Sequence, residues 1–211
     1  MDEAEARAWV KSAFDVPRET MERLDRFNAL LTEENERQNL VSAATLPRLW
    51  SRHIADSAQV LTWASSPGAW LDLGSGAGFP GLVIAALTRQ RGTLVEARRL
   101  RAEFLGRAAA VLQVEVEIAA SRVERLPSRP FATISARAFA PLGKLLDLAE
   151  RFSTEKTVWI LPKGRNAQSE LDAVAATWQG DFRLEPSLTD PDARIIVATG
   201  VSRRKARSRR A

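Results

Sequence analysis

The chain has 211 residues, of which 45% are hydrophobic, enough for one domain with a core and a short extra lobe. It contains no cysteine, which excludes disulfides, thiolate metal sites and a cysteine nucleophile. The acidic start from Met1 to Glu5 does not resemble a signal peptide, and no apolar run approaches the roughly 18 residues of a membrane span. We therefore expect a cytoplasmic protein with no membrane partner and no metal.

The net charge of +5 comes from the end of the chain. Residues 202–211 contain six basic residues and no acidic one, whereas the remainder has 25 basic and 26 acidic residues. This segment is either a flexible cationic arm that adds affinity for phosphate or a solvated run with no partner. In both interpretations residues 202–211 form a basic, flexible tail.

Residues 1–66 are expected to form an N-terminal helical lobe packed on the main domain. After a short helical pattern at 4–14, Pro17 precedes apolar residues that recur at spacings of three and four up to Leu31. Residues 35–41 break this pattern. Pro47 then opens another predicted helix that extends to residue 63, before a turn rich in serine, proline and glycine.

Residues 67–201 show strands that alternate with helices. The predicted strands are 69–73, 93–96, 114–119, 132–135, 157–161, 182–186 and 194–199, and the predicted helices are 80–88, 98–112, 141–151 and 166–178. Such alternation indicates a mainly parallel sheet covered on both faces. The linker 187–193 is too short for a crossover helix, so the last two strands should be antiparallel. This α/β pattern is typical of class I, Rossmann-like S-adenosylmethionine-dependent methyltransferases, with seven strands and an antiparallel last strand.

Two glycine patterns overlap in the loop that follows the first strand of this domain. They are Gly74, Gly76 and Gly78 with Asp72 ahead, as in S-adenosylmethionine sites, and Gly76, Gly78 and Gly81, as in dinucleotide sites. Glu96 lies 20 residues beyond Gly76, where an acid can accept ribose hydroxyls of either cofactor. The less specific interpretation of Glu96 is a solvent-exposed acid at a strand end.

Other features favour S-adenosylmethionine over a nicotinamide cofactor. The first glycine of a dinucleotide loop should follow its strand closely, yet Gly76 does not. The chain has no tyrosine and no cysteine, and its only histidine, His53, precedes the sheet, which removes the common proton-transfer groups of dehydrogenases. We therefore predict S-adenosylmethionine as cofactor, with Asp72 either neutralising its ammonium group or bracing the loop.

Several motifs between residues 27 and 172 resemble one known family. They include Arg52-His53-Ile54-Ala55-Asp56-Ser57, the glycine loop, Ser121-Arg122-Val123-Glu124, Arg137-Ala138-Phe139-Ala140 and Pro162-Lys163-Gly164. In order and spacing, the chain resembles the bacterial 16S ribosomal RNA guanine-N7 methyltransferases, also called the RsmG or glucose-inhibited division protein B (GidB) family.

The resemblance implies an activity and a set of contacts. The implied activity is methylation of N7 of guanine 527 in 16S rRNA, acting on the RNA or on the small ribosomal subunit. Cofactor contacts are implied at Gly74, Phe79, Val123, Glu124 and Arg137.

Methylation at guanine N7 needs no general base, because N7 of a neutral guanine already carries a lone pair. Catalysis should come mainly from positioning, and a cation close to the reacting centre should be absent because guanine becomes positively charged. Arg137 should therefore grip the cofactor's carboxylate or an RNA phosphate at some distance, unless it is merely ion-paired at its strand end.

His53 has two open interpretations. It has a functional role, which is either to contact RNA or to close the N-terminal lobe over the cofactor, or it is a hydrogen-bonded structural residue. Together with Arg137 it is a candidate for positioning the substrate. The candidate RNA-phosphate contacts are Arg52, Lys163, Arg165, Arg203, Arg204 and Lys205.

Two rival functions remain at this point, besides the nicotinamide enzyme. One is a methyltransferase of a small metabolite, and the other is a non-catalytic RNA-binding ribosome assembly factor that retains the fold. We expect the protein to be a monomer.

Overall fold

The computed structural model describes residues 1–64 and 68–204. Its centre is a seven-stranded sheet with the order β3-β2-β1-β4-β5-β7-β6. The strands are β1 (Trp70–Leu73), β2 (Gly92–Val95), β3 (Val116–Ala119), β4 (Thr133–Ala136), β5 (Val158–Lys163), β6 (Trp178–Pro186) and β7 (Arg194–Arg203). The pairs among β1 to β5 are parallel, and β7 is antiparallel to both β5 and β6. This confirms the predicted α/β class with an antiparallel last strand.

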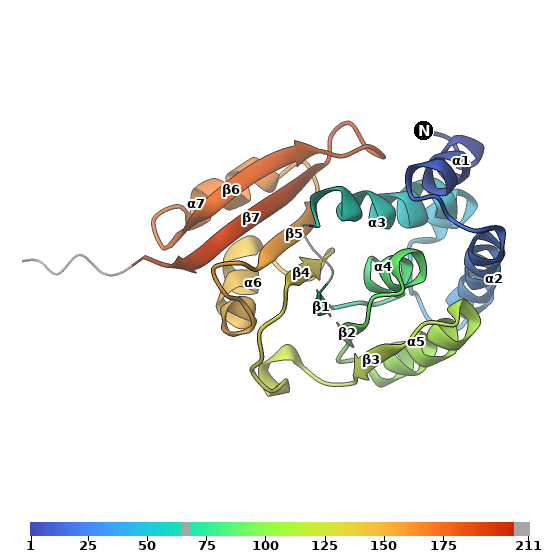
Figure 1. The fold of residues 1–211 in the computed structure, drawn as a ribbon, viewed down its shortest axis with the longest axis horizontal. Coiled ribbons are helices and arrows are strands. Elements are labelled where there is room, and N and C mark those ends of the chain that lie inside the picture. Colours follow the sequence, from blue (N-terminus) through green and yellow to red (C-terminus); the bar gives the residue numbers. More distant parts are fainter. Residues whose placement is uncertain (65–67, 205–211) are drawn as a thin grey trace, which may run out of the picture.

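Helices cover both faces of the sheet (Figure 1). The α-helices are α1 (Glu3–Ala13), α2 (Arg18–Asn35), α3 (Asp56–Ala58), α4 (Gly81–Thr88), α5 (Arg99–Leu112), α6 (Leu142–Ala149) and α7 (Ala167–Val174). α6 and α7 lie on one face, and α4 and α5 lie on the other together with the N-terminal helices. Within the described residues, no helix is long and apolar enough to span a membrane.

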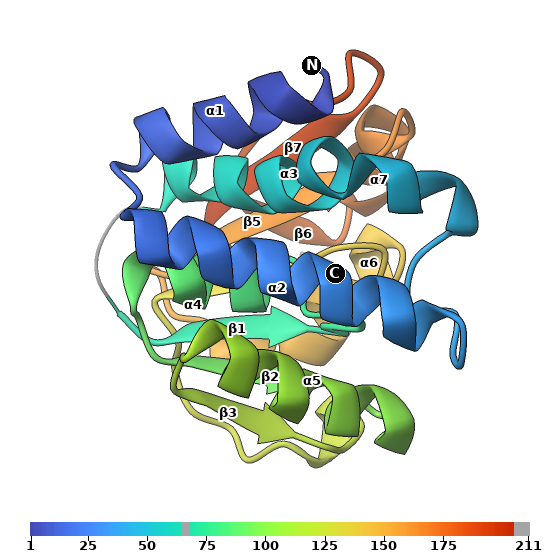
Figure 2. The same ribbon diagram turned by 90° about the vertical axis from the view of Figure 1, so that its right-hand side faces the viewer.

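The N-terminal helices share a hydrophobic core with the sheet domain (Figure 2). Phe27 of α2 is fully buried, and its ring centroid lies 5.6 Å from that of Phe79 and 6.4 Å from that of Phe104 in α5. Burying aromatic rings from three segments removes a large apolar area from water and holds these segments together. The predicted boundary at residues 66 and 67 lies outside the described residues.

The predicted helix at 47–63 is not one regular α-helix. It consists of the 3₁₀-helix Ala43–Arg48, the π-helix Trp50–Ala55, α3 and the 3₁₀-helix Gln59–Trp63. Pro47 has no backbone amide to donate. The amides of Trp50 and Ser51 donate to the carboxylate of Glu3 in α1, at 2.9 and 2.8 Å. These long-range bonds replace the local hydrogen bonds that an α-helix would form here.

The C-terminal hairpin is longer than the sequence predicted. α7 ends at Val174 and β6 already begins at Trp178, while β7 continues to Arg203. Arg203 pairs with Trp178 across the hairpin, and its guanidinium lies 4.9 Å above the Trp178 ring. Residues 202 and 203 therefore belong to the sheet and not to a tail. Residues 205–211, including Lys205, lie outside the described residues.

The strand register brings the expected site residues to one edge of the sheet. Leu73, the last residue of β1, pairs with Val95 of β2 and Ala136 of β4, the last residues of those strands. The residues that follow each strand therefore converge at the carboxyl edge, where ligands bind in sheets of this kind.

Candidate functional site

Two neighbouring cavities open at the carboxyl edge of the sheet. The glycine-loop cavity, about 440 Å³, is lined by Gly74, Val95–Arg98, Arg101, Ser121–Glu124, Ala138–Ala140, Lys144 and Leu148. The Arg137 cavity, about 720 Å³, is lined by Thr45, Arg52, His53, Asp56, Arg137–Pro141, Pro162–Gly164, Glu170, Ser187, Asp190 and Ala193–Ile195. Both volumes lie in the range of small-molecule sites. Residues 138–140 line both cavities, and we call them the shared wall.

The glycine loop has the backbone conformation that its sequence predicts. Gly74, Gly76 and Gly78 have φ angles of +69°, +54° and +96°, a region that residues with a side chain rarely adopt. A Cβ at Gly74 would collide with the ring of Phe139, and one at Gly78 would collide with Leu82 of α4. A Cβ at Gly76 would meet no atom closer than 3.7 Å. Close packing therefore requires glycine at two of these positions, and space remains beside the third.

Asp72 braces the glycine loop and does not line the cavity. Its carboxylate is fully buried and accepts hydrogen bonds from Ser135 Oγ at 2.7 Å and from the amide of Gly81 at 3.3 Å. Burial raises the pKa of Asp72. Of the two interpretations from sequence, these contacts support bracing over direct neutralisation of a ligand's ammonium.

Glu96 lies in the glycine-loop cavity and is held in place by backbone amides. It is only 7% exposed, so it is not a solvated strand-end acid. Its carboxylate accepts from the amide of Gly76 at 3.1 Å and from that of Arg98 at 2.8 Å. A carboxylate has about four acceptor positions, so capacity remains for two ribose hydroxyls.

The remaining family-implied contacts divide into two groups. Val123 is buried and Glu124 is exposed, and both line the glycine-loop cavity, where an adenine would lie. The ring of Phe79 is instead 3% exposed and packs against Phe27 and His53, so this ring is not available to a ligand of the cavity.

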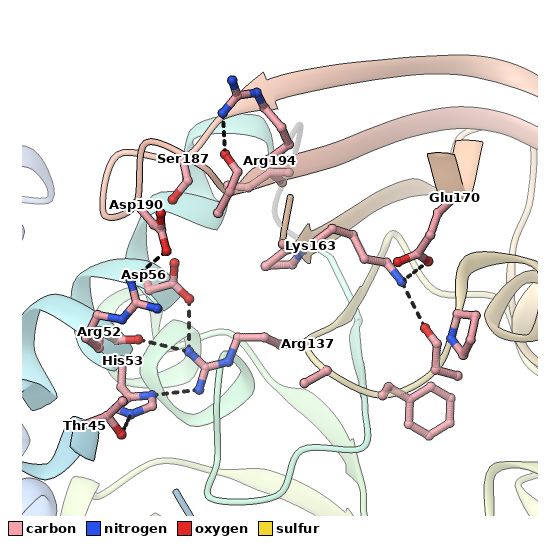
Figure 3. Close-up of a pocket in the computed structure, with 18 residues that line it drawn as sticks. Thr45, Arg52, His53, Asp56, Arg137, Lys163, Glu170, Ser187, Asp190 and Arg194 are labelled. Carbon is pink, nitrogen blue, oxygen red and sulfur yellow. Dashed lines mark hydrogen bonds and ion pairs between the residues drawn. The ribbon is translucent and has the colours of Figure 1, made fainter. Parts of the chain in front are cut away.

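Arg137 connects the end of β4 to the N-terminal segment (Figure 3). Its Nη1 donates to the carboxylate of Asp56 at 3.0 Å and to the carbonyl of Arg52 at 3.3 Å, and its Nη2 lies 2.9 Å from Nδ1 of His53. Arginine can only donate, so Nδ1 of His53 must be an unprotonated acceptor. Arg137 is thus ion-paired at its strand end while it also lines the Arg137 cavity.

His53 is a neutral structural histidine in this arrangement. Its ring stacks on Phe79 at 4.9 Å, and its Nε2 lies 2.9 Å from Oγ of Thr45, whose own proton goes to the carbonyl of Ser42. Burial, together with the charges of Arg137 and Arg52, lowers the pKa of His53 to about 3. These contacts favour the hydrogen-bonded interpretation of His53.

Most of the predicted RNA contacts have protein partners. Arg52 pairs with Asp190 at 2.9 Å, which lowers the pKa of that carboxyl group. Lys163 is 10% exposed and donates to Glu170 at 2.8 Å and to the carbonyl of Ala140 at 2.9 Å. In this structure the Lys163 side chain supports the shared wall, so its predicted contact with phosphate competes with these two partners.

The other predicted RNA contacts lie elsewhere. Arg203 pairs with Asp147 and Glu150 of the α6 region, and Arg204 donates to the carbonyls of Ala175 and Trp178. Arg165 is exposed but lines neither cavity.

Four cations that the sequence did not single out surround the glycine-loop cavity. They are Arg98, Arg101, Arg122 and Lys144. Arg98 follows two residues after Glu96, and Arg122 precedes the Val123-Glu124 pair. Their positions just beyond strand ends are a signal in the sequence that could have identified them.

The residues of the glycine-loop cavity fit S-adenosylmethionine. Glycines at positive φ let a ligand approach bare backbone, and the fixed Glu96 carboxylate suits a ribose. Among the residues that the structure describes, no group of three histidine or acidic side chains is placed to hold a metal ion.

Comparisons with known proteins agree with this geometry. The model of the GidB family, rRNA small subunit methyltransferase G, matches residues 20–187. The chain is 52% identical over 209 residues to the ribosomal RNA small subunit methyltransferase G of Rhizorhabdus wittichii, covering 97% of this chain and 95% of the relative. Identity to the same-named protein of Zymomonas mobilis is 47% over 217 residues, covering 99% and 98%.

Solved structures of low identity share the fold. The O-methyltransferase from Bacillus cereus in complex with SAH has a TM-score of 0.58 at 14% identity, over 82% of this chain and 90% of that chain. MtNAS in complex with S-adenosylmethionine has a TM-score of 0.57 at 14% identity, over 84% and 74%. The match to the family model and the named relatives favour neither the small-metabolite enzyme nor the nicotinamide enzyme. The chain belongs to the rRNA small subunit methyltransferase G family of S-adenosylmethionine-dependent methyltransferases.

Proposed function

We propose that this protein transfers a methyl group from S-adenosylmethionine to N7 of guanine 527 in 16S rRNA. The observation that carries the proposal is the pair of cavities separated by the shared wall. One of them has a glycine loop and a fixed acid, which suit the cofactor. The other is large enough for a base. The family relationship supports rRNA of the small subunit as the acceptor.

The residues near the Arg137 cavity fit an acceptor that needs no general base. When bound, S-adenosylmethionine supplies a methyl group on a sulfonium, which N7 attacks with its own lone pair. His53 already uses both ring nitrogens in hydrogen bonds. The carboxylates of the lining are each paired with a cation; they are Asp56, Asp190 and Glu170. The protein therefore contributes mainly by holding N7 in line with the methyl group.

Three of the four cations that line the Arg137 cavity pair with a carboxylate. Arg52, Arg137 and Lys163 each pair with a carboxylate, at 2.9, 3.0 and 2.8 Å. Arg194 donates to the carbonyls of Pro191 and Ala193. Among the described residues, Arg194 is thus the one cation of this lining without a carboxylate partner, which limits the repulsion of a guanine that becomes positive as it is methylated.

The cavity accepts a base only when that base is unpaired or extruded, because the N7 edge must enter beside the cofactor. We also propose that the protein acts as a monomer in the cytoplasm, where the small ribosomal subunit is assembled.

The test is incorporation of labelled methyl groups. The protein is incubated with labelled S-adenosylmethionine and with undermethylated small subunits, deproteinised 16S rRNA or a mixture of small metabolites, and the product is mapped. We expect labelled 7-methylguanosine only at position 527 of the rRNA, and no label in the metabolites. Labelled metabolites would support the small-molecule methyltransferase. RNA binding without turnover would support a non-catalytic assembly factor.

A further inference from the structure

The cations around the two cavities differ in their partners. Those of the Arg137 cavity are paired with carboxylates or bound to carbonyls. Around the glycine-loop cavity the cations form no ion pair within residues 1–64 and 68–204; we call them the cationic rim, and they are Arg98, Arg101, Arg122 and Lys144. The side chains of Arg98, Arg122 and Lys144 are exposed.

The acids of this cavity do not neutralise the rim. Glu96 is buried and accepts backbone amides, and Glu124 is the other acid of the lining. Arg101 is half-buried, and its Nη2 donates to the carbonyl of Asn39 at 2.9 Å, which leaves its charge uncompensated. Four cations thus face two acids at the mouth of one cavity.

We propose that the cationic rim binds backbone phosphates of the rRNA acceptor, an inference that rests on the function proposed above. Guanidinium groups bind phosphate through paired hydrogen bonds, and ammonium groups bind it as point charges. Exposed cations without carboxylate partners break no ion pair when they bind phosphate, and their binding releases counterions from the RNA. The partner that fits this surface is therefore a nucleic-acid backbone.

The rim and the Arg137 cavity divide the recognition of one nucleotide strand. The neutral base enters the Arg137 cavity, where three of four cations are ion-paired, while the charged backbone lies on the rim, where the described residues provide no ion pair. Because residues 138–140 line both cavities, the backbone beside an extruded base passes the mouth of the glycine-loop cavity. The phosphate contacts predicted for Arg52 and Lys163 are thereby assigned to the rim, because Arg52 and Lys163 are already ion-paired.

The rim has two possible anionic ligands, because S-adenosylmethionine carries a carboxylate and RNA carries phosphates. Two double variants separate these sources. R122Q/K144Q removes two rim charges. The matched control R91Q/K156Q removes the same two residue types from exposed positions just before β2 and β5, at the opposite edge of the sheet.

The experiment measures binding of undermethylated small subunits between 50 and 300 mM salt, the affinity for S-adenosylmethionine by calorimetry, and the melting temperature. We expect R122Q/K144Q to bind subunits on the order of tenfold more weakly at 0.1 M salt, with a salt slope smaller by about 1 to 2. Its melting temperature should match that of R91Q/K156Q, and its affinity for S-adenosylmethionine should fall by a smaller factor than its affinity for subunits.

Three outcomes would contradict the proposal. They are equal subunit affinity for the two double variants, an unchanged salt slope for R122Q/K144Q, or a loss confined to the affinity for S-adenosylmethionine. Failure of the proposed function gives a different result, namely that the unmodified protein itself does not methylate small subunits.

Discussion

At the scale of single residues, His53 is a histidine whose two ring nitrogens are both engaged in hydrogen bonds. Arg137 fixes its Nδ1 as an acceptor, and burial lowers its pKa to about 3. In the unfolded chain, His53 takes up a proton as the pH falls through about 6.5. In the folded chain, it does so only at a pH of about 3. The contribution of His53 to stability is therefore complete above pH 6.5 and is lost as the pH falls towards 3.

We predict that His53→Phe makes stability less dependent on pH. In the unmodified protein, the free energy of unfolding should fall between pH 6.5 and 5 by up to about 1.4 kcal/mol per pH unit from His53. His53 is the only histidine in the chain, so the variant lacks this slope. Urea denaturation at several pH values measures both. Parallel curves for the two proteins would show that His53 titrates normally in the folded state.

The open space beside Gly76 predicts a sharp difference between two substitutions. Gly76→Ala adds a methyl group with no atom closer than 3.7 Å, so cofactor binding should survive at a backbone cost of about 1–2 kcal/mol. Gly76→Asp should abolish binding, because it places a carboxylate in the ligand's path and next to Glu96. Calorimetry with S-adenosylmethionine distinguishes them, and near-normal affinity in Gly76→Asp would refute the assignment of the loop.

The positions of site residues were predictable where local geometry determines them. The glycines and Glu96 follow from spacing around one strand-loop-helix unit. The ion pairs of Arg52 and Lys163 could not be predicted from spacing, because tertiary structure brings their carboxylate partners to them. Asp190 lies 138 residues from Arg52, and nothing local in the sequence indicates that they meet.

At the scale of elements, Lys163 joins three parts of the structure. From the end of β5 its ammonium group donates to the carbonyl of Ala140 in the shared wall and to Glu170 of α7. Glu170 in turn accepts from the amide of Leu142 at the start of α6, at 2.6 Å. These three bonds fix the wall from behind.

We therefore predict that Lys163→Met weakens the wall rather than the contact with RNA. The substitution keeps an apolar stem but removes the donor, which should cost about 1–3 kcal/mol in stability because Ala140 and Glu170 lose their partner. The KM for both substrates should rise, since the wall lines both cavities. The salt slope of subunit binding should stay the same, and a slope smaller by about 1 would mean that Lys163 contacts phosphate after all.

Elements were predictable in type but less so in detail. Alternating strands and helices gave the α/β class because the apolar periodicity of each element is local. The segment 47–63 was predicted as one helix since its apolar face has helical spacing. Its hydrogen bonds instead adapt to Glu3, and that contact is absent from any local pattern.

At the scale of the whole molecule, the end of the chain has two parts with different expected roles. Residues 202 and 203 belong to β7, and Arg204 donates to the carbonyls of Ala175 and Trp178. Residues 205–211 contain four basic residues and no acidic one. The predicted tail therefore has to be tested from residue 205.

We predict that a chain ending at residue 204 keeps its melting temperature but binds small subunits more weakly at low salt, with a smaller salt slope. A chain ending at residue 201 should in addition melt several degrees lower, because it loses the pairing of Arg203 with Trp178 and Asp147. Scanning calorimetry and salt titrations measure these effects. An unchanged slope for the first truncation would leave residues 205–211 as a solvated run with no partner.

The sharing of residues 138–140 by both cavities also constrains how this enzyme can change its acceptor in evolution. A larger side chain at Ala138 or Ala140 narrows the space of both ligands, so a mutation that admits a new acceptor on this side also harms the use of the methyl donor. Ser187 and Asp190 line only the Arg137 cavity. If the two cavities bind acceptor and methyl donor as proposed, single mutations in the β6–β7 loop can alter the acceptor preference without narrowing the space of the methyl donor.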